Sequence, residues 1–430
     1  MTKEEIIQKL TRVEHDLDQM TKGTRYASVL NYDGLVRKTV QEDRKITIWS
    51  EAIEKALAEA GSVYFPAAKE PYFIDRPIIL DSNMHIKADP GAVIRAVEGM
   101  ETCMVRNRHL EVIQEIPAPK KDFVHDVNMS VSGGIWDHAK FKRNHKKCRE
   151  AVDSKIPYAE GMFLFLNVAN IAFTDLTMMR SPAYAFLFAN GENLLVRNIL
   201  FDECHTDGPH VEGPFQNIII KNLTGQTGDD FFTLNSWCDE VCYGPVDCAW
   251  VSNLKMIGGF RGMRLTSSTG RNNGGYPLTN IVVEHVSGTR DFKMIPCTTQ
   301  ATLQSFRKLD HAGFMDWIYI EDIEFLEHWQ TNNRQFNFNG CVQLHSNVGR
   351  IFFKDLRGPA PHIKVGPYGL PDDSSESYNL LYQNDYDCVV EHMELSDFAD
   401  KTQDEIVWCV SGEKGRGIIK ELEYPLTIHT

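Results

Sequence analysis

A short phrase repeats along the chain at nearly constant spacing, and it restricts the fold more than any other feature. The copies that begin at Asn170, Asn193 and Asn217 start 23 and 24 residues apart (193 − 170 and 217 − 193). Each joins a turn residue to a strand in which inward-facing apolar side chains alternate with other residues, as in Asn170-Ile-Ala-Phe-Thr-Asp-Leu176. A fourth copy begins at Asn280, and looser copies begin at Trp317, Gly349 and Asp387.

Stacked units of this length bury a continuous aliphatic column and form a solenoid. A leucine-rich repeat has a similar period, but it requires Leu at fixed positions and a helix in each unit. Here every repeated element has the pattern of a strand or a turn. We therefore predict an all-β fold, a single-stranded right-handed parallel β-helix. The wider spacing of the copies after Asp230 predicts long loops on one side, where a site is expected.

Two helices are predicted before the repeat. Thr2 and Glu5 match a capping box, and apolar residues follow at intervals of three and four, at Ile6, Leu10, Val13, Leu17 and Met20. This amphipathic helix needs a surface, either the body of the chain or a second subunit, which would give a homo-oligomer. A second helix over 48–60, stopped by Gly61, is expected to cap the solenoid, and short strands follow over 62–94. We divide the chain into a helix and lead-in, 1–45, and a β-helix catalytic domain, 46–430.

Composition excludes several classes of protein. The net charge of −14 argues against nucleic acid as a partner, because phosphate binding needs a basic surface. No stretch approaches the roughly 20 apolar residues that span a bilayer, so no membrane partner is expected. The start MTKEEIIQKL lacks the apolar region of a secretory signal, which predicts a cytoplasmic protein unless a signal was removed. The ten cysteines are sparse and read as buried thiols; Cys238, Cys242 and Cys248 lack a zinc-site spacing, and we expect no metal or cofactor.

Two acidic segments interrupt the repeat, His205-Thr206-Asp207 and Gly228-Asp229-Asp230. Each follows a repeat strand, and their aspartates lie 22 residues apart (229 − 207), about one coil. Stacked coils place such segments side by side, with backbones roughly 4.8 Å apart. Either motif alone is a common turn. One coil apart and beside long loops, they predict a cluster of three carboxylates.

Such a cluster suits the hydrolysis of glycosidic bonds. This reaction needs one carboxylic acid to protonate the leaving oxygen and one carboxylate to activate water or attack carbon. Like charges held close together raise the pKa of one carboxyl, which supplies the protonated acid.

These motifs resemble those of glycoside hydrolase family 28, the polygalacturonases and their relatives, which are pectin-active right-handed parallel β-helices. The family carries an Asn-Thr-Asp motif followed one turn later by Gly-Asp-Asp, matched here by His205-Thr206-Asp207 and Gly228-Asp229-Asp230 within 191–236. The resemblance implies that Asp229 is the general acid, that Asp207 and Asp230 hold and deprotonate the attacking water, and that the anomeric carbon is inverted.

The chain also departs from the family pattern. The family's next motif is Gly-His-Gly, and the corresponding stretch places Arg261 where the histidine stands; its later Arg-Ile-Lys motif has only Arg290-Asp-Phe-Lys293 as a counterpart. An altered acidic sugar is therefore expected, gripped by Arg261, Arg264 and Lys293, since Arg can hold a carboxylate with two parallel hydrogen bonds. Further substrate-binding candidates are His205, His210 and Trp237, although a turn histidine and a core tryptophan are equally good interpretations.

The sequence thus predicts a glycosidase that cleaves α-linked uronic-acid-containing or pectin-derived oligosaccharides. One alternative on the same scaffold is a polysaccharide lyase or sugar epimerase, in which Arg or Lys abstracts a proton beside a uronate carboxyl and Ca²⁺ binds the aspartates. Another is a non-catalytic carbohydrate-binding β-helix.

Overall fold

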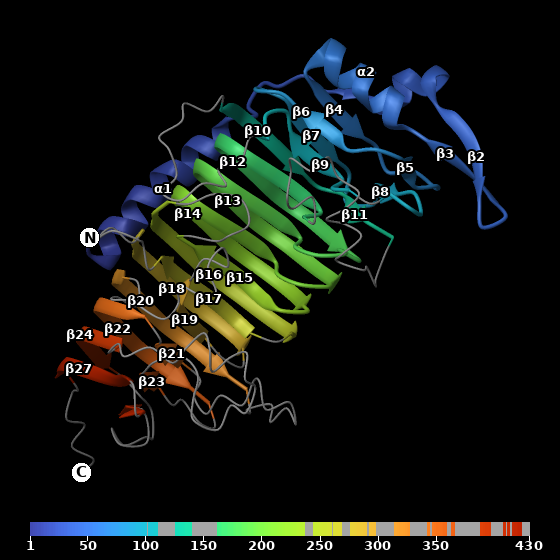
Figure 1. The fold of residues 1–430 in the computed structure, drawn as a ribbon. Coiled ribbons are helices and arrows are strands. Elements are labelled where there is room, and N and C mark those ends of the chain that lie inside the picture. The colour runs from blue at the N-terminus through green and yellow to red at the C-terminus, as the bar shows by residue number, and fades with distance from the viewer. Residues whose placement is uncertain are drawn as a thin grey trace, which may run out of the picture.

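The computed structural model is a long parallel β-helix that carries one helix along its side and another at its N-terminal end (Figure 1). The predicted fold class is confirmed. The structure describes residues 1–100, 102–110, 125–139, 161–236, 244–259, 261–268, 276–289, 292–297, 314–326, 342–344, 346–358, 363–365, 388–396, 407–409, 411–412 and 415–423.

The central coils are built by long strands that bend around the solenoid. β12 (Phe163–Met179), β13 (Phe186–Cys204) and β14 (Pro209–Thr227) pair in parallel, so that Phe163 faces Phe186 and Phe186 faces Pro209. Their bends occur at residues with positive φ, among them Asn170, Asn193 and Asn217 at 56 to 60°. Asparagine tolerates this left-handed conformation better than most residues, which explains why it begins the repeated phrase.

The same asparagines form a ladder of side-chain amides along the solenoid. The Nδ2 atom of Asn193 donates to Oδ1 of Asn170 at 2.8 Å, and Nδ2 of Asn217 donates to Oδ1 of Asn193 at 2.8 Å. The ladder continues from Asn170 to Asn128 and from Asn128 to Asn83. Each hydrogen bond gives a partner to amide groups that are partly buried at a bend. The hydrogen bonds therefore recur with the same period as the sequence repeat.

Shorter strands complete the solenoid on either side. Before β12 it contains β1 (Ala27–Ser28), β4 (Ser62–Phe65), β5 (Tyr72–Ile74), β6 (Ile78–Leu80), β7 (His85–Ala88), β8 (Val93–Ala96), β9 (Val105–Asn107), β10 (Asp126–Ser132) and β11 (Ile135–Asp137). After β14 it contains β15 (Asp230–Asn235), β16 (Val246–Gly258), β17 (Arg261–Ser268), β18 (Leu278–Thr289), β19 (Phe292–Cys297), β20 (Phe314–Phe325), β21 (Val342–Leu344), β22 (Asn347–Arg357), β23 (Ile363–Val365), β24 (Cys388–Ser396), β25 (Val407–Cys409), β26 (Ser411–Gly412) and β27 (Gly415–Glu423).

The interior is a continuous apolar column in which aromatic rings stack from coil to coil. Trp136 and Phe163 meet edge to face at 5.0 Å between ring centroids, and Phe163 meets Phe186 in the same way at 5.5 Å. These side chains are fully buried. The free thiols of Cys103, Cys204 and Cys388 are also buried, as predicted for these cysteines, and so is Cys248 of the cysteine cluster.

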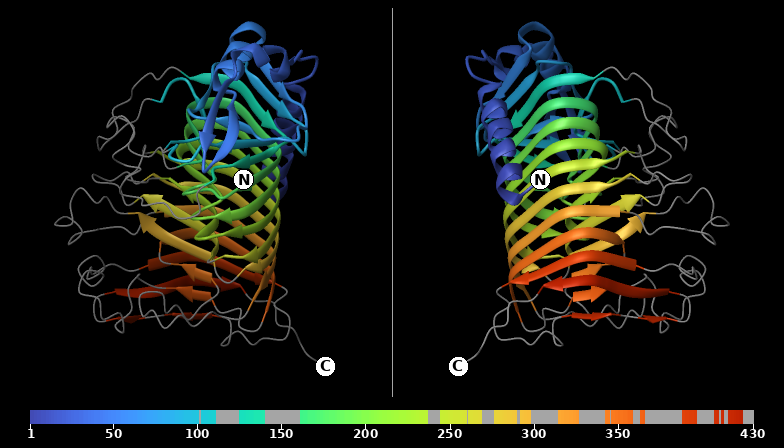
Figure 2. Two further views of the ribbon diagram at one scale, coloured as in Figure 1. Left: turned by 90° about the vertical axis from the view of Figure 1, so that its right-hand side faces the viewer. Right: turned by 90° about the vertical axis from the view of Figure 1, so that its left-hand side faces the viewer.

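Helix α1 (Lys3–Gln19) begins with the predicted capping box and lies along one side of the solenoid, across successive coils (Figure 2). Its buried Ile6, Leu10 and Leu17 pack against apolar residues that those coils present outward, which are Ala172, Leu195, Ile219, Cys248 and Val282. Ion pairs flank this contact, from Glu14 to Arg197 and Lys221. Of the two surfaces considered for this helix, it packs on the body of this chain. Its apolar face is therefore not free for a second subunit.

The N-terminal end of the solenoid is covered by helix α2 (Ser50–Ala60), which ends at Gly61 in the left-handed conformation. Before it, the 3₁₀ segment η1 (Val29–Leu35) packs on α2. A hairpin of β2 (Arg37–Gln41) and β3 (Arg44–Ile48) spans the domain boundary predicted at residues 45 and 46. β3 pairs with β5, so the lead-in belongs to the first coils. Among the described helices, none is long and apolar enough to cross a membrane.

Candidate active site

One sheet of the solenoid carries the polar residues that the sequence singled out. Its register aligns His210 of β14 with Thr233 of β15, Thr233 with Arg264 of β17, and Arg264 with Lys293 of β19. A second row aligns Asp230 with Arg261. Because residues in register lie on the same face, the side chains of His210, Thr233 and Arg264 form one row across neighbouring coils, and those of Asp230 and Arg261 form another.

The three predicted aspartates come together at one end of this sheet. Asp207, Asp229 and Asp230 each offer a carboxylate oxygen within 4.8 Å of the others. The backbone N–H of Asp230 donates to Oδ1 of Asp207 at 3.2 Å, and the Thr233 hydroxyl lies 3.1 Å from Asp207 Oδ2 and 3.3 Å from Asp230 Oδ2. The prediction that the two motifs meet one coil apart is therefore confirmed.

A glycine allows the two turns to stack so closely. A Cβ atom on Gly228 would lie 1.9 Å from the backbone oxygen of His205, which is far inside any contact distance. The Gly-Asp-Asp order therefore has a structural cause: the glycine lets the backbones touch, and the following two residues then lie beside Asp207.

The three carboxyl groups differ in exposure. The side chain of Asp229 is 38% exposed, whereas Asp207 is almost fully buried and Asp230 is fully buried. Only Asp229 therefore presents its carboxyl group to solvent, and the other two lie behind it.

Two arginines on the next coil pair with the carboxylates. The Nη2 atom of Arg261 lies 2.9 Å from Oδ1 of Asp229, and its Nη1 atom lies 3.0 Å from Oδ1 of Asp230. The Nε atom of Arg264 lies 3.5 Å from Oδ2 of Asp230. The sequence predicted that Arg261 binds a sugar carboxylate. Arg261 is instead buried, and its guanidinium neutralises the aspartates. The side chain of Arg264 stays 25% exposed and can do both.

The environments of Asp207 and Asp230 shift their pKa values in opposite directions. Burial raises the pKa of Asp230 to about 7, with Asp229 and Asp207 adding to the effect and Arg261 and Arg264 opposing it. Burial alone would also raise the pKa of Asp207, but the hydrogen bond and charge of His210, with the charge of Arg264, hold it below its ordinary value. The site thus holds a carboxyl that keeps a proton near neutral pH beside one that is ionised.

His210 lies behind the cluster. Its Nδ1 atom is 2.7 Å from Asp207 Oδ2, its Nε2 atom is 3.3 Å from Glu212 Oε1, and its ring lies 4.3 Å from the Tyr184 ring. Burial lowers the pKa of an imidazole, but Asp207 and Glu212 outweigh it and raise the pKa of His210 to about 10. The ring is fully buried, so it is placed to tune the carboxylates and not to contact a sugar, the role predicted from the sequence.

The remaining predicted residues are less informative. His205 is half-buried in the turn before Asp207, and its backbone N–H donates to the Ser181 carbonyl at 3.1 Å. Lys293 occupies the register position beside Arg264. Trp237 lies outside the described residues, as do Cys238 and Cys242 of the cysteine cluster.

Sequence reasoning missed three residues of the site, Glu212, Thr233 and Asn235. Glu212 stands two positions after His210 on the same strand, so the alternation could have identified it. Thr233 and Asn235 each lie one coil after a residue of that strand, in register with His210 and Glu212, so the repeat period could have identified them. All three are buried, and Glu212 pairs in register with Asn235.

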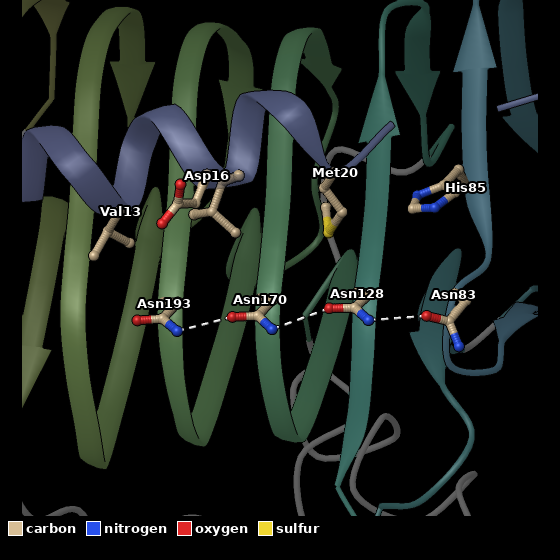
Figure 3. A pocket seen from close by; sticks show the side chains of 9 residues that line it. Val13, Asp16, Met20, Asn83, His85, Asn128, Asn170 and Asn193 are labelled. Atoms are coloured by element: carbon tan, nitrogen blue, oxygen red, sulfur yellow. Dashed lines mark hydrogen bonds between the residues drawn. The ribbon is translucent and has the colours of Figure 1, made fainter. Parts of the chain in front are cut away.

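Two other places could hold a ligand. A cavity of about 460 Å³ lies between α1 and the asparagine ladder, lined by Val13, Asp16 and Met20 on one side and by Asn128, Asn170 and Asn193 on the other (Figure 3). The ladder amides there bond to one another.

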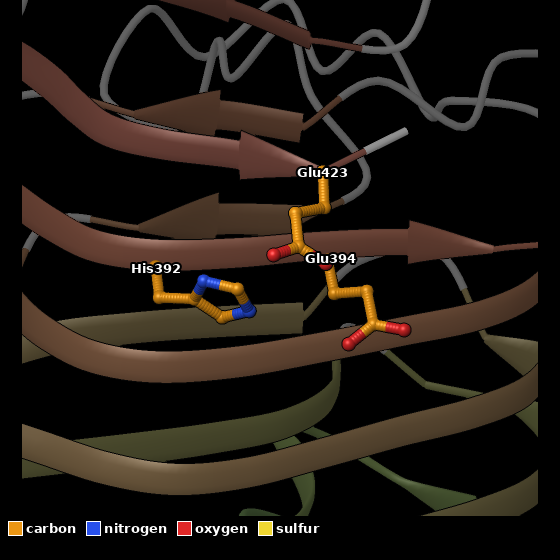
Figure 4. Close-up of side chains that lie close together, drawn as sticks. All are labelled: His392, Glu394 and Glu423. Carbon is orange, nitrogen blue, oxygen red and sulfur yellow. The ribbon is translucent and has the colours of Figure 1, made fainter. Parts of the chain in front are cut away.

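The other place lies far along the solenoid, where His392, Glu394 and Glu423 gather on β24 and β27 (Figure 4). His392 also lies 3.4 Å from Glu421. The strands that carry this cluster pair with β22 and with each other, not with the strands that carry the aspartates.

The sequence matches no protein-family model and no curated protein. Solved structures are similar in fold: an exopolygalacturonase from Thermotoga maritima is 15% identical with a TM-score of 0.57, and the match covers 96% of this chain and 95% of that one. The A-module of the mannuronan C-5 epimerase AlgE4 from Azotobacter vinelandii is 11% identical, with a TM-score of 0.53 and coverage of 90% and 98%.

A mutant tailspike protein of E. coli bacteriophage HK620, in complex with a pentasaccharide, is 10% identical with a TM-score of 0.58, over 92% of this chain and 65% of that one. At such low identities the likeness describes architecture. The chain therefore has a polygalacturonase-like parallel β-helix fold.

Proposed function

We propose that this protein is a glycoside hydrolase that cleaves α-linked uronic-acid-containing or pectin-derived oligosaccharides. The observation that carries the proposal is the pair of neighbouring carboxyls with opposite pKa shifts, lowered for Asp207 and raised to about 7 for Asp230. Glycoside hydrolysis requires such a pair, one group to accept a proton and one to give it. The similar folds, which include an exopolygalacturonase, support a carbohydrate as the substrate.

The charges of the site account for its proton. Among its described residues, four carboxyls (Asp207, Asp229, Asp230 and Glu212) face three cations (His210, Arg261 and Arg264). One carboxyl is therefore in excess, and a bound proton balances it. Burial raises the pKa of Asp230 to about 7, so Asp230 holds this proton, and the contact that both aspartates share with Arg261 places Asp229 beside it.

Each residue then has a step in the reaction. Asp229, the exposed member of the pair, delivers the proton to the leaving oxygen as the bond from that oxygen to the anomeric carbon breaks. Asp207 takes a proton from the water whose oxygen bonds to that carbon, and Asp230 helps to hold this water. Arg264, with Lys293 beside it in register, binds the sugar carboxylate.

Inversion at the anomeric carbon remains the expectation that the family resemblance provides. The nearest carboxylate oxygens lie within 4.8 Å of one another. Most inverting enzymes separate the two carboxyl groups by roughly 6.5–9.5 Å and retaining ones by about 5–5.5 Å, so the spacing gives inversion no support of its own. Proton NMR of the first product anomer decides between the two outcomes.

The test is incubation of the full chain with acidic and neutral oligosaccharides, with products measured by mass. We expect hydrolysis of acidic substrates and its loss, by at least a thousandfold in kcat (of the order of 4 kcal/mol), in Asp229→Asn. The matched control is Asp202→Asn, which removes an exposed carboxylate on the neighbouring coil and should keep full activity. Full activity in Asp229→Asn would contradict the assignment of Asp229 as the general acid.

The two alternatives give different results in the same experiment. A lyase produces an unsaturated sugar that absorbs in the ultraviolet, and an epimerase changes configuration without cleavage. Either would lose activity with a chelator if Ca²⁺ binds the aspartates. Arg261 and Arg264 argue against Ca²⁺, because they already bring positive charge to the oxygens that the ion would need. Binding without turnover would indicate a carbohydrate-binding protein.

A further inference from the structure

His210 connects two buried carboxylates. On one side its Nδ1 atom lies 2.7 Å from Asp207, and on the other its Nε2 atom lies 3.3 Å from Glu212. All three side chains are at most a few per cent exposed. The three groups therefore form a chain, carboxylate–imidazole–carboxylate, that runs from the base proposed above into the protein interior.

Among the described residues, His210 is the only cation within ion-pair distance of Glu212. Neither of its carboxylate oxygens has a hydrogen bond of good geometry, and the closest charged group is the His210 ring. An ionised carboxylate is costly to bury unless a counter-charge compensates it. Glu212 therefore favours the doubly protonated, cationic form of His210.

The other groups around His210 are compatible with this cation. The Tyr184 ring lies against it at 4.3 Å between centroids, and the Asn235 amide lies 3.0 Å from Nε2. The amide serves either protonation state, because a half-turn about its terminal bond exchanges donor and acceptor. Further away, Thr233 bonds to Asp207, and Asp230 and Arg264 face Asp207 from the next coils. Arg264 is a second cation near Asp207, and of these two described cations His210 is the one with a hydrogen bond to the Asp207 carboxylate.

We propose that His210 and Glu212 are positioning residues for the hydrolysis proposed above: Glu212 keeps His210 cationic, and His210 orients Asp207 and keeps it ionised as the base. This inference rests on the proposed function. Neither residue touches the sugar. The two act in series, so Glu212 influences the reaction only through His210.

The first experiment is an NMR titration of the histidine rings in the full chain, which needs no substrate. We expect His210 to remain protonated at pH 8 and to release its proton at a pH lower by at least one unit in Glu212→Gln. His85 is the internal control, because burial lowers its pKa and its ring should be neutral at pH 8. A neutral His210 at pH 8 in the unaltered chain would overturn the proposal.

The second experiment compares pH profiles of kcat. His210→Gln alone leaves Glu212 buried without a cation and can fail to fold, so His210→Gln/Glu212→Gln is the working variant. We expect its acidic limb to move up by about one pH unit, which lowers kcat about tenfold on that limb, with KM changed less than threefold. The control His85→Gln should keep the original limb. An unmoved limb in the double variant contradicts the proposal, and absence of hydrolysis in the unaltered chain contradicts only the proposed function.

Discussion

The Nη1 atom of Arg261 lies 3.0 Å from the Oδ1 atom of Asp230, and the two residues are direct partners in the register of neighbouring coils. The same guanidinium also reaches Asp229 at 2.9 Å. An arginine at the position where the resembling family keeps a histidine thus neutralises the carboxylates themselves. Its charge limits how far burial can raise the pKa of Asp230.

Removal of this charge should raise the pKa of Asp230 further. In Arg261→Gln we expect the alkaline limb of the pH–rate profile to move upward by about one unit, because Asp230 then keeps to higher pH the proton that Asp229 delivers. The measurement is kcat against pH on an acidic oligosaccharide. Arg95→Gln is the matched control: it removes an arginine from Asp137, which keeps Arg180 as its partner, on an earlier coil. An alkaline limb that stays in place would mean that Arg261 does not act on the acid.

The raised pKa of Asp230 also predicts how stability depends on pH. Between its ordinary value of 3.8 and about 7, the folded protein holds a proton that the unfolded chain has released, so this group's contribution to stability falls as pH rises through that window. Asp230→Asn lacks the ionisation. Relative to the unaltered protein, its stability should therefore increase from pH 4.5 to pH 8, by on the order of 3 kcal/mol.

Urea unfolding at the two pH values measures this difference. Comparison within each pH cancels the contributions of the other carboxyls. A stability difference that is equal at pH 4.5 and pH 8 would show that Asp230 ionises in the folded state as it does in the unfolded chain.

The sequence predicted the fold because the physical requirement of the solenoid recurs in every coil. Asn170, Asn193 and Asn217 mark the bends by their positive φ, and the apolar residues between them fill the column. The grouping of Asp207 with Asp229 and Asp230 followed from the same period. Because each bend recurs at the same place in successive coils, spacing along the chain determines position in space.

The pairing of side chains could not be read in the same way. Whether Arg261 points to a sugar or to Asp230 depends on how deep the aspartates lie, and depth depends on loops that the repeat does not specify. His210 is hidden for the same reason: its register position was predictable, but its burial between Asp207 and Glu212 was not. The sequence likewise did not show what α1 packs against, because the repeat alone does not place Leu195 and Ile219 outside the apolar column.

The asparagine ladder should contribute measurably to stability. Asn193→Ala loses two amide hydrogen bonds and places alanine at a φ of 59°, which together should cost about 2–4 kcal/mol. Asn193→Gly loses the same hydrogen bonds without the backbone strain and should cost about 1 kcal/mol less than alanine. Denaturant unfolding of both variants separates the two effects. Equal destabilisation by alanine and glycine would mean that the backbone conformation is not the reason for asparagine at this position.

The last prediction concerns the attachment of α1. Leu10 is fully buried between the helix and the solenoid, and the thiol of Cys248 lies buried in the same cluster. Leu10→Ala removes apolar contact worth about 2–5 kcal/mol, so the helix should separate from the coils more often. Each separation exposes Cys248, whose pKa burial raises to about 11 while the helix is in place. We therefore expect Cys248 to react with a thiol reagent at least tenfold faster in Leu10→Ala.

Arg12→Ala is the control, because Arg12 is exposed on the outer face of the same helix. Mass mapping distinguishes Cys248 from the thiols of Cys103, Cys204 and Cys388, which α1 does not cover and whose rates should not change. Faster reaction at all four would indicate that the whole solenoid had loosened. Equal rates for Cys248 in the two variants would show that Leu10 does not hold the helix in place. An increase confined to Cys248 would assign the helix to a local unit, stabilised by its own contact and able to open while the coils that carry the aspartates remain folded.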